Sequence, residues 1–248
     1  MGTETLAATA RMIVAVGKGV LAADESNGTM SQRLESIGVV PTTDTRRDWR
    51  QLIFTADGLN EYTSGVIMFD ETIRQSSDDG RSLVDILSNA GIVPGIKVDR
   101  GTHPLAGAKG EAVTEGLDGL RGRLAEYFDM GARFTKWRAV MSINDKTPSD
   151  YCIAVNAHAL GRYAALAQEA GLVPIVEPEI LMTGSHSIDD CYTATERTLA
   201  RTFDELAAQG VDLSAMILKP NMVISGHEAP DRATTAEVAE RTLNCLKQ

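Results

Sequence analysis

The sequence contains few cysteines and histidines. Its 248 residues include three cysteines and four histidines. Cys152, Cys191 and Cys245 form no CxxC pair, and the scattered histidines form no HExxH motif. These absences argue against a disulfide framework and against a zinc site. We therefore expect a cytoplasmic protein without a bound metal.

Positive charge is also scarce. Lys and Arg number 24 against 34 Asp and Glu, which gives a formal charge of −10. A nucleic-acid-binding protein would need a basic face, so we expect no nucleic-acid partner. Small anionic substrates remain compatible with this net charge, because a local cluster of Lys and Arg can make one site positive. No apolar run approaches the ~20 residues of a membrane span, and no signal peptide is evident, so we expect no membrane partner either.

Six short apolar runs predict β-strands. Most are continuously apolar, which is typical of parallel strands buried on both faces. The runs lie near residues 19–24, 65–70, 93–99, 132–138, 173–180 and 215–221. Helical patterns cover residues 4–16, 45–56, 82–90, 117–130, 148–170, 187–209 and 234–247. This alternation predicts an α/β protein with a parallel sheet.

Two parallel architectures fit this alternation. A spacing of ~40 residues per unit favours a TIM (β/α)8-type barrel with loop insertions. The alternative is a doubly wound open sheet, but its glycine fingerprint should follow the first strand, and here Gly17 and Gly19 precede its core. We expect one domain over residues 1–248. A complete barrel has eight strand–helix units, and we count about six, so the C-terminal strands are expected to be missing.

Charged side chains end five of the apolar runs. Lys219 follows the last run, and the others end at Asp24, Lys97, Lys136 and Glu177. Active sites of (β/α) barrels lie where the carboxyl ends of the strands meet. These five charges are therefore expected to converge on one site.

Lys219 is the candidate nucleophile. A lysine attacks a carbonyl only as the neutral amine, and a neighbouring cation such as Lys136 would favour that form. A lone strand-end lysine is more readily interpreted as one whose ammonium reaches water. The set of strand-end charges favours the functional interpretation.

Three carboxylates are candidates for general acid and base. Glu177 and Glu179 flank Pro178 and point to the same side of a strand, so they suit proton transfer. Alternatively, they form structural ion pairs with lysines. Asp24 is a further acid/base candidate, or else a turn or N-cap aspartate before Ser-Asn-Gly.

A hydroxyl-rich turn follows the first strand. Ser26, Thr29 and Arg33 could hold a phosphate through hydroxyls, a helix N-terminus and a guanidinium. Serines in such a turn are as readily explained as turn-formers.

Two further cations lie on strands. Lys97 shares a face with Asp99, so it could bind substrate or form an ion pair with that carboxylate. Arg138 shares a face with Lys136 and suits phosphate or carboxylate contacts. Trp137, between them, is expected to pack in the core.

Five long segments carry a family resemblance that runs across essentially the whole chain. They are GKGVLAADESNGTMSQRLESIG (17–38), GIKVDRGTHPLAG (95–107), FTKWRAV (134–140), VPIVEPEIL (173–181) and LKPNMV (218–223). Together they resemble the class I, Schiff-base-forming fructose-1,6-bisphosphate aldolases. The resemblance implies a TIM barrel, a homotetramer, and reversible cleavage of fructose 1,6-bisphosphate to dihydroxyacetone phosphate and glyceraldehyde 3-phosphate.

The resemblance also implies residue roles. Lys219 would form the Schiff base with the ketose C2, and Glu177 would shuttle protons during its formation. Asp24 would take the C4 hydroxyl proton as the C3–C4 bond breaks. Lys136 would keep Lys219 neutral and polarise substrate oxygens, and Glu179 would tune that pair.

Substrate binding would involve the remaining candidates. Lys97 and Arg138 would hold hydroxyl and phosphate groups, and Ser26, Thr29 and Arg33 would line the phosphate path. A protonated imine accepts the electrons of the broken bond, so no metal or other cofactor is expected.

The family has two further strands, which carry more of the phosphate site. We therefore expect this chain to be part of a longer protein, and weakly active on its own. The alternative is a catalytically impaired fragment or scaffold that keeps the motifs. Transaldolase and deoxyribose-phosphate aldolase are rival Schiff-base enzymes, but the number of matched segments argues against them.

Overall fold

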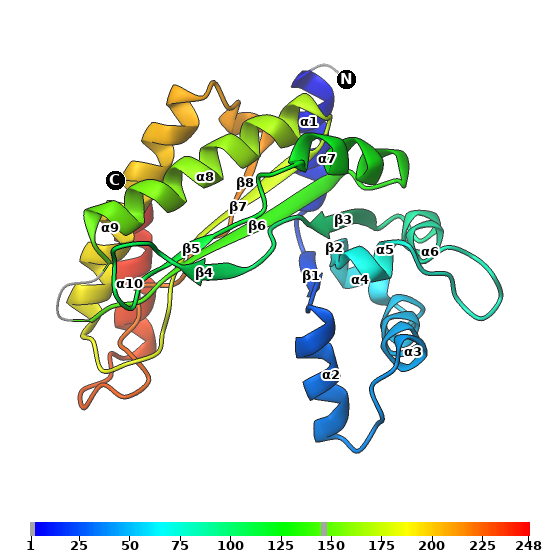
Figure 1. The fold of residues 1–248 in the computed structure, drawn as a ribbon, viewed down its shortest axis with the longest axis horizontal. Helices are drawn as coiled ribbons and strands as arrows, with labels where there is room; N and C mark the ends of the chain where they lie inside the picture. The colour runs from blue at the N-terminus through cyan, green and yellow to red at the C-terminus, as the bar shows by residue number, and fades with distance from the viewer. Residues whose placement is uncertain (1–2, 145–147) are drawn as a thin grey trace.

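The central feature of the computed structural model, which describes residues 3–144 and 148–248, is a six-stranded parallel sheet (Figure 1). Its strands are β1 (Gly19–Ala23), β2 (Thr63–Met68), β3 (Val93–Lys97), β6 (Phe134–Met141), β7 (Val173–Ile180) and β8 (Ile217–Leu218). Their spatial order follows the sequence, and every neighbouring pair is parallel. A doubly wound sheet would reverse its order at a switch point, so that alternative is wrong.

The sheet is a half-barrel and not a closed cylinder. In the described part of the chain, β1 and β8 form its two edges and do not pair with each other. The expected α/β barrel architecture with about six units is confirmed. Strand β8 is shorter than predicted, because a 3-10 turn (Leu213–Ala215) precedes it and Pro220, which has no N–H to donate, follows Lys219.

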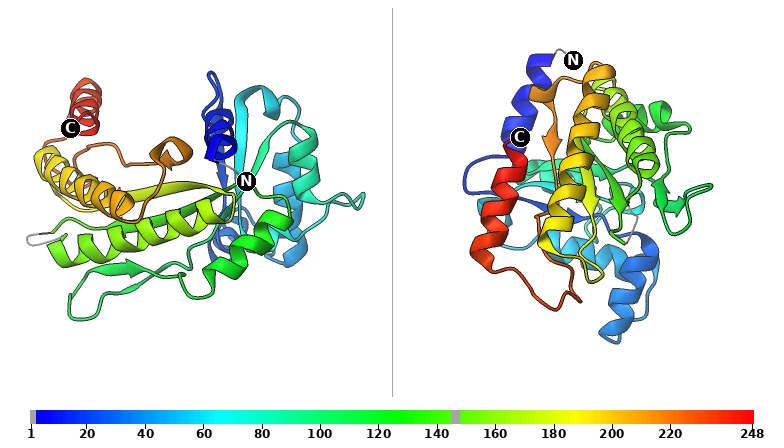
Figure 2. Two further views of the ribbon diagram at one scale, coloured as in Figure 1. Left: turned by 90° about the horizontal axis from the view of Figure 1, so that it is seen from above. Right: turned by 90° about the vertical axis from the view of Figure 1, so that its left-hand side faces the viewer.

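The longest helices pack together on one side of the sheet (Figure 2). They are α8 (Asp150–Glu169) and α9 (Ile188–Ala208), which cover β6 and β7. The other helices are α1 (Thr3–Ile13), α2 (Asn27–Ser36), α3 (Thr43–Phe54), α4 (Leu59–Tyr62), α5 (Asp70–Ile73), α6 (Leu83–Asn89), α7 (Leu120–Asp129) and α10 (Thr235–Leu246). All seven helices expected from the sequence are present, with ends shifted by up to three residues.

Several short elements were not predicted. They are α2, α4, α5 and an antiparallel hairpin of β4 (Thr102–Pro104) and β5 (Ala112–Thr114). Helix α2 buries only Met30 and Leu34, so its apolar pattern is weak. Helices α4 and α5 have four residues each, too short to show a helical period.

Phe134 fills the sheet interior at its amino-terminal end. The ring is fully buried and lies against two glycines on neighbouring strands, Gly65 and Gly95. A Cβ on Gly95 would lie 2.3 Å from the ring, far inside van der Waals contact. Trp137, three residues later in β6, is also fully buried and stacks on Tyr163 with the ring centroids 5.5 Å apart, so its expected packing role is confirmed.

Gly95→Ala is therefore expected to destabilise the protein, by about 1–3 kcal/mol, the usual cost of overpacking a core. Chemical denaturation would measure this loss. Gly19→Ala in β1 is the matched control, because a Cβ there meets no atom within 4 Å. Equal effects of the two substitutions would contradict the packing argument.

Candidate active site

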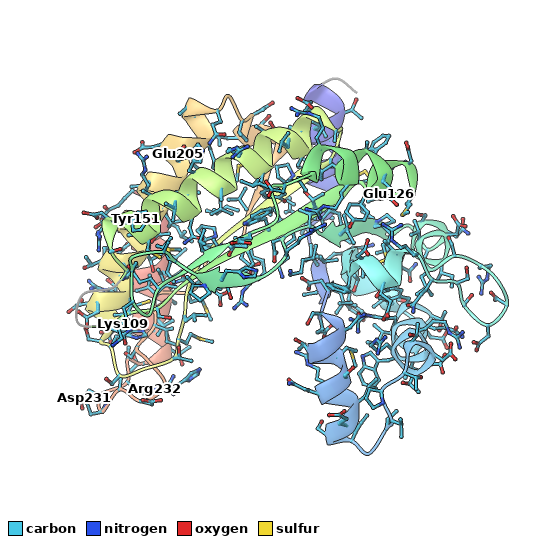
Figure 3. The ribbon with its side chains drawn as sticks, viewed as in Figure 1. Lys109, Glu126, Tyr151, Glu205, Asp231 and Arg232 are labelled. Atoms are coloured by element: carbon cyan, nitrogen blue, oxygen red, sulfur yellow. The ribbon has the colours of Figure 1, made fainter. Side chains whose placement is uncertain are left out.

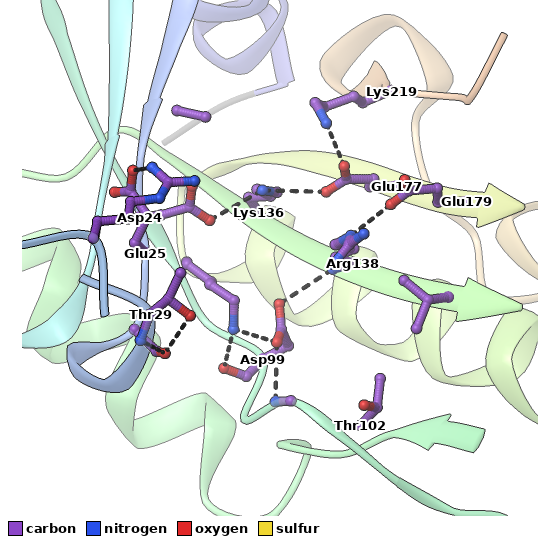
Figure 4. A pocket seen from close by; sticks show the side chains of 16 residues that line it. Asp24, Glu25, Thr29, Asp99, Thr102, Lys136, Arg138, Glu177, Glu179 and Lys219 are labelled. Atoms are coloured by element: carbon purple, nitrogen blue, oxygen red, sulfur yellow. Dashed lines mark hydrogen bonds and ion pairs between the residues drawn. The ribbon is translucent and has the colours of Figure 1, made fainter. Parts of the chain in front are cut away.

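A cavity of about 580 Å³ opens at the carboxyl edge of the sheet (Figure 4). Its walls come from the ends of β1, β3, β6, β7 and β8 and from α2. All ten residues expected to form the site line it: Asp24, Ser26, Thr29, Arg33, Lys97, Lys136, Arg138, Glu177, Glu179 and Lys219. The predicted convergence of the strand-end charges is therefore confirmed.

Glu177 joins the two lysines of the site. The Lys219 ammonium donates a hydrogen bond to Glu177 Oε1. On the other side, the Lys136 ammonium lies 3.3 Å from Glu177 Oε2 and donates to Asp24 Oδ2 at 3.0 Å. Glu177, Lys136 and Asp24 are all buried. The result is a continuous row of alternating charges from Lys219 to Asp24, visible in Figure 4.

Lys136 is a cation held between carboxylates. Burial is the largest single influence on its pKa and lowers it, but Asp24 and Glu177 together outweigh burial and raise the pKa above its ordinary value. Lys136 therefore stays protonated at neutral pH. Asp24 accepts its hydrogen bond and caps no helix, so the interpretation of Asp24 as an N-cap is wrong.

Lys219 stands at the edge of the sheet. Its backbone N–H donates to Val176 O at 2.9 Å, which continues the β7–β8 pairing by one residue. No described strand covers β8 on its other side, and 47% of the Lys219 side chain is exposed. The strand-end position of Lys219 is confirmed, and because its strand is an edge of the described sheet, the amine is open to solvent.

Glu179 belongs to a different ion pair from Glu177. Its Oε2 accepts a hydrogen bond from Arg138 Nε at 2.5 Å. Burial is the largest influence on the pKa of Arg138 and lowers it, but the bond that Arg138 donates to Glu179 contributes to a net rise. The two carboxylates are two residues apart on β7 and bind different cations, so the lysine ion pairs expected for both exist only for Glu177.

Asp99 organises the Lys97 side of the cavity. The Lys97 ammonium donates to its carboxylate and, at 3.1 Å, to its backbone carbonyl. The same buried carboxylate accepts from the backbone N–H groups of Gly101 at 3.1 Å and Arg138 at 3.2 Å. The ion-pair interpretation of Lys97 is thus confirmed, and the pair still lines the cavity.

The hydroxyl-rich turn begins helix α2. Ser26 is its N-cap, and its Oγ accepts from Thr29 N at 3.3 Å. The two hydroxyl oxygens lie 3.1 Å apart. Arg33, one turn further along, is mostly exposed and pairs with Glu25. Ser26 thus takes the N-cap position that the sequence analysis offered to Asp24, and both hydroxyls still line the cavity.

One charged residue of the cavity and its buried partner escaped the sequence analysis. Glu25 lines the cavity and forms an ion pair with Arg50, whose Nη2 lies 2.8 Å from Glu25 Oε2. Arg50 is 3% exposed, and burial, the largest influence, lowers its pKa. Its position four residues before buried Phe54 in α3 was the available signal, because both lie on the inward face of that helix.

Comparison with known proteins places this site in a family. The sequence profile of class I fructose-bisphosphate aldolases matches residues 5–248. A probable class 1 fructose-bisphosphate aldolase of Xanthomonas campestris is 53% identical over 247 residues, covering 100% of this chain and 74% of the relative. The chain belongs to the class I fructose-bisphosphate aldolase family. The resemblance carried by the five sequence segments is confirmed.

Other aldolases are similar to this chain in sequence or structure over the same region. The cytoplasmic isozyme 2 of Pisum sativum is 50% identical, covering 99% of this chain and 68% of its own length. The solved aldolase of Plasmodium falciparum, crystallised with TRAP and a small-molecule inhibitor, superposes with a TM-score of 0.97 at 43% identity, covering 99% of this chain and 71% of that one. The aldolase fold is therefore shared throughout the part described.

Residues 3–144 and 148–248 lack two features, a membrane-spanning helix and a cluster of metal ligands. No helix there has both the length and the hydropathy needed to cross a bilayer. Nor do these residues include a cluster of three or more His, Cys, Asp or Glu side chains suited to a metal ion.

Proposed function

We propose that this chain carries the catalytic lysine of a fructose-bisphosphate aldolase. It would cleave fructose 1,6-bisphosphate reversibly to dihydroxyacetone phosphate and glyceraldehyde 3-phosphate, as the names of its relatives suggest. The observation that carries the proposal is the placement of Lys219 and Lys136 on opposite oxygens of the single buried carboxylate of Glu177. This arrangement supplies an amine, a proton carrier and a fixed cation in one row.

Glu177 would move the protons of imine formation. It would accept a proton from Lys219, so that the neutral amine attacks the C2 carbonyl and forms a carbinolamine. The same acid would return the proton to the carbinolamine hydroxyl, which leaves as water. Lys136, held as a cation beside Glu177, would oppose a second positive charge at Lys219 and stabilise the developing negative charge on oxygen.

Asp24 would act in the bond cleavage. It would remove the C4 hydroxyl proton, so that the new C4 carbonyl forms as the C3–C4 bond breaks. The electron pair of that bond would move into the protonated imine on Lys219 and leave an enamine. Proton return to C3 and hydrolysis of the imine would release dihydroxyacetone phosphate and regenerate the free amine. Glu179 would tune this site through Arg138.

The remaining cavity residues would bind the substrate. Lys97 and Arg138 would contact hydroxyl and phosphate oxygens, since each is held in place by a carboxylate. Ser26 and Thr29 would offer hydroxyls at the start of α2, where the helix dipole favours a phosphate, and Arg33 would add a positive charge at the cavity wall.

The wider setting is also a proposal. We infer a single domain over residues 1–248, a homotetrameric assembly and a sugar phosphate as the ligand. We also infer a location in the cytoplasm, which the names of several relatives suggest. One observation favours a second candidate, a non-catalytic scaffold: both edges of the described sheet are unpaired, and Lys219 lies at one of them.

Glu177→Gln tests the proton-carrier role. The amide cannot take up the Lys219 proton, so kcat for fructose 1,6-bisphosphate cleavage is expected to fall by about 10²–10⁴-fold. Glu179→Gln is the matched control, because it makes the same chemical change two residues away, and its loss should be much smaller. Equal losses in the two variants would contradict the proposed role of Glu177. A wild-type chain that folds but cleaves no substrate would favour the scaffold.

A further inference from the structure

A second cavity, of about 620 Å³, lies beside the proposed active site. It shares Ser26, Lys97, Asp99 and Gly101 with the first cavity. Its other lining residues are Phe69, Asp70, Arg74, Arg100, Arg123 and Tyr127. They come from the end of β2, from α5, from the turn after β3, and from α7. The reaction proposed above uses none of these six residues.

The second cavity carries an excess of positive charge. Four cationic side chains line it against two carboxylates, although the whole chain has a net charge of −10. Arg74 is balanced by Asp70 at 2.9 Å and by Glu126 at 2.6 Å, and Lys97 is balanced by Asp99. Within the described ranges, no carboxylate forms an ion pair with either Arg100 or Arg123. The cavity is therefore a local positive site that attracts anions.

Arg123 is a fixed part of this charge. Its Nη1 donates to Val98 O at 2.9 Å, and its Nη2 donates to Gly116 O at 2.5 Å. Both acceptors are neutral carbonyls, so these bonds leave the positive charge uncompensated, and only the more distant carboxylate of Asp70, whose pKa this charge helps to lower, opposes it. The buried Nε–H has no partner among the residues that the structure describes. A guanidinium that is already held in place loses little freedom when it binds an anion.

The turn at Arg100 fixes the backbone of the second unpaired arginine. Its N–H donates to Glu115 O at 2.8 Å. The next residue, Gly101, has a φ of +88° and donates its N–H to the Asp99 carboxylate at 3.1 Å. The Arg100 side chain is exposed and lines the cavity, where it is free to close on a ligand.

Asp70 offers a complementary acceptor. Its Oδ1 accepts bonds from Arg74 at 2.9 and 3.0 Å and from the Tyr127 hydroxyl at 2.8 Å. Burial, the largest influence, raises the pKa of Asp70, but these bonds outweigh it and lower the pKa below its ordinary value. Its Oδ2 accepts no hydrogen bond from the described residues. The ionised carboxylate thus keeps one oxygen for a ligand hydroxyl.

We propose that this cavity is a second ligand site, specific for a small polyol phosphate. Arg100 and Arg123 would bind the phosphate, and Asp70 would accept a bond from a ligand hydroxyl. The site is separate from the reaction at Lys219 and does not depend on it. Because Lys97 and Asp99 line both cavities, a ligand in one would be close enough to affect the other.

Binding of sn-glycerol 3-phosphate tests the proposal, because this polyol phosphate has no carbonyl and cannot form an imine. Calorimetry at low ionic strength is expected to show two binding events. Arg100→Gln should weaken one event about tenfold, the effect of losing one charged hydrogen bond, and Arg100→Glu should abolish it. Arg138→Gln should weaken only the other event. Arg232→Gln, at the opposite end of the molecule from Glu126 (Figure 3), is the control and should change neither.

Two results would overturn this inference. One is a single binding event that Arg138→Gln weakens and both Arg100 variants leave unchanged. The other is equal weakening by Arg100→Gln and Arg232→Gln, which would indicate non-specific attraction. Circular dichroism and thermal unfolding would establish that each variant is folded. Covalent trapping at Lys219 reports on the proposed reaction separately, so the two proposals can fail independently.

Discussion

Replacing Lys219 by arginine is expected to reduce cleavage of fructose 1,6-bisphosphate by a factor on the order of 10⁵, comparable with the loss of other covalent nucleophiles. The guanidinium keeps the positive charge beside Glu177 but cannot act as an amine nucleophile. A coupled assay of triose phosphate formation, with purified variant and wild-type protein, would measure this loss.

Stability should change little in this variant. The Lys219 side chain is 47% exposed, so the longer arginine has room at the sheet edge. Lys247→Arg, in an exposed position near the end of α10, is the matched control and should retain full activity. If Lys219→Arg kept more than about a tenth of the wild-type turnover, the amine of Lys219 would not be the nucleophile, and the proposed reaction would be wrong.

The second large effect is expected from Lys136→Met. This substitution leaves the carboxylates of Asp24 and Glu177 buried, and Asp24 loses the cation to which it is bonded. Removing one partner of a buried ion pair lowers the free energy of unfolding by about 3–5 kcal/mol, because the remaining charge is uncompensated. Chemical denaturation of the variant and the wild type would measure the change in the free energy of unfolding.

Two variants control this measurement. The double variant Lys136→Met/Asp24→Asn removes the unpaired charge of Asp24 and should recover part of the lost stability, since Glu177 keeps its pair with Lys219. Arg121→Met breaks the exposed pair with Glu169 and should cost less than about 1 kcal/mol. A Lys136→Met variant as stable as Arg121→Met would show that the buried charge row contributes little to the fold.

Much of the architecture could be predicted from the sequence because local patterns determine it. Continuous apolar runs such as Pro174–Val176 form strands buried on both faces, and the long helices α8 and α9 have a clear start and end. The hairpin of Thr102–Pro104 and Ala112–Thr114 could not be predicted, because its three-residue strands are too short for any period.

The residues of the site were easier to predict than the ion pairs that they form with one another. Strand ends placed Lys136, Glu177 and Lys219 at one edge, since carboxyl ends of parallel strands meet there. Which carboxylate pairs with which cation depends on side-chain packing in the folded site. In the β6–β7 register Arg138 lies opposite Glu177, yet its guanidinium pairs with Glu179, and no pattern in the sequence indicates that choice. The exposure of Lys219 follows from β8 lying at an edge of the described sheet, which the count of about six strands, with this one last, does indicate.

The most direct test of the central claim is covalent trapping at Lys219. The protein would be incubated with dihydroxyacetone phosphate and sodium borohydride, digested, and mapped by mass spectrometry. The proposed mechanism predicts one reduced ketose-phosphate adduct, on Lys219, and its loss in Lys219→Arg. Folded wild-type protein that gives no adduct, or an adduct on Lys136 or Lys97 that persists in Lys219→Arg, would contradict it.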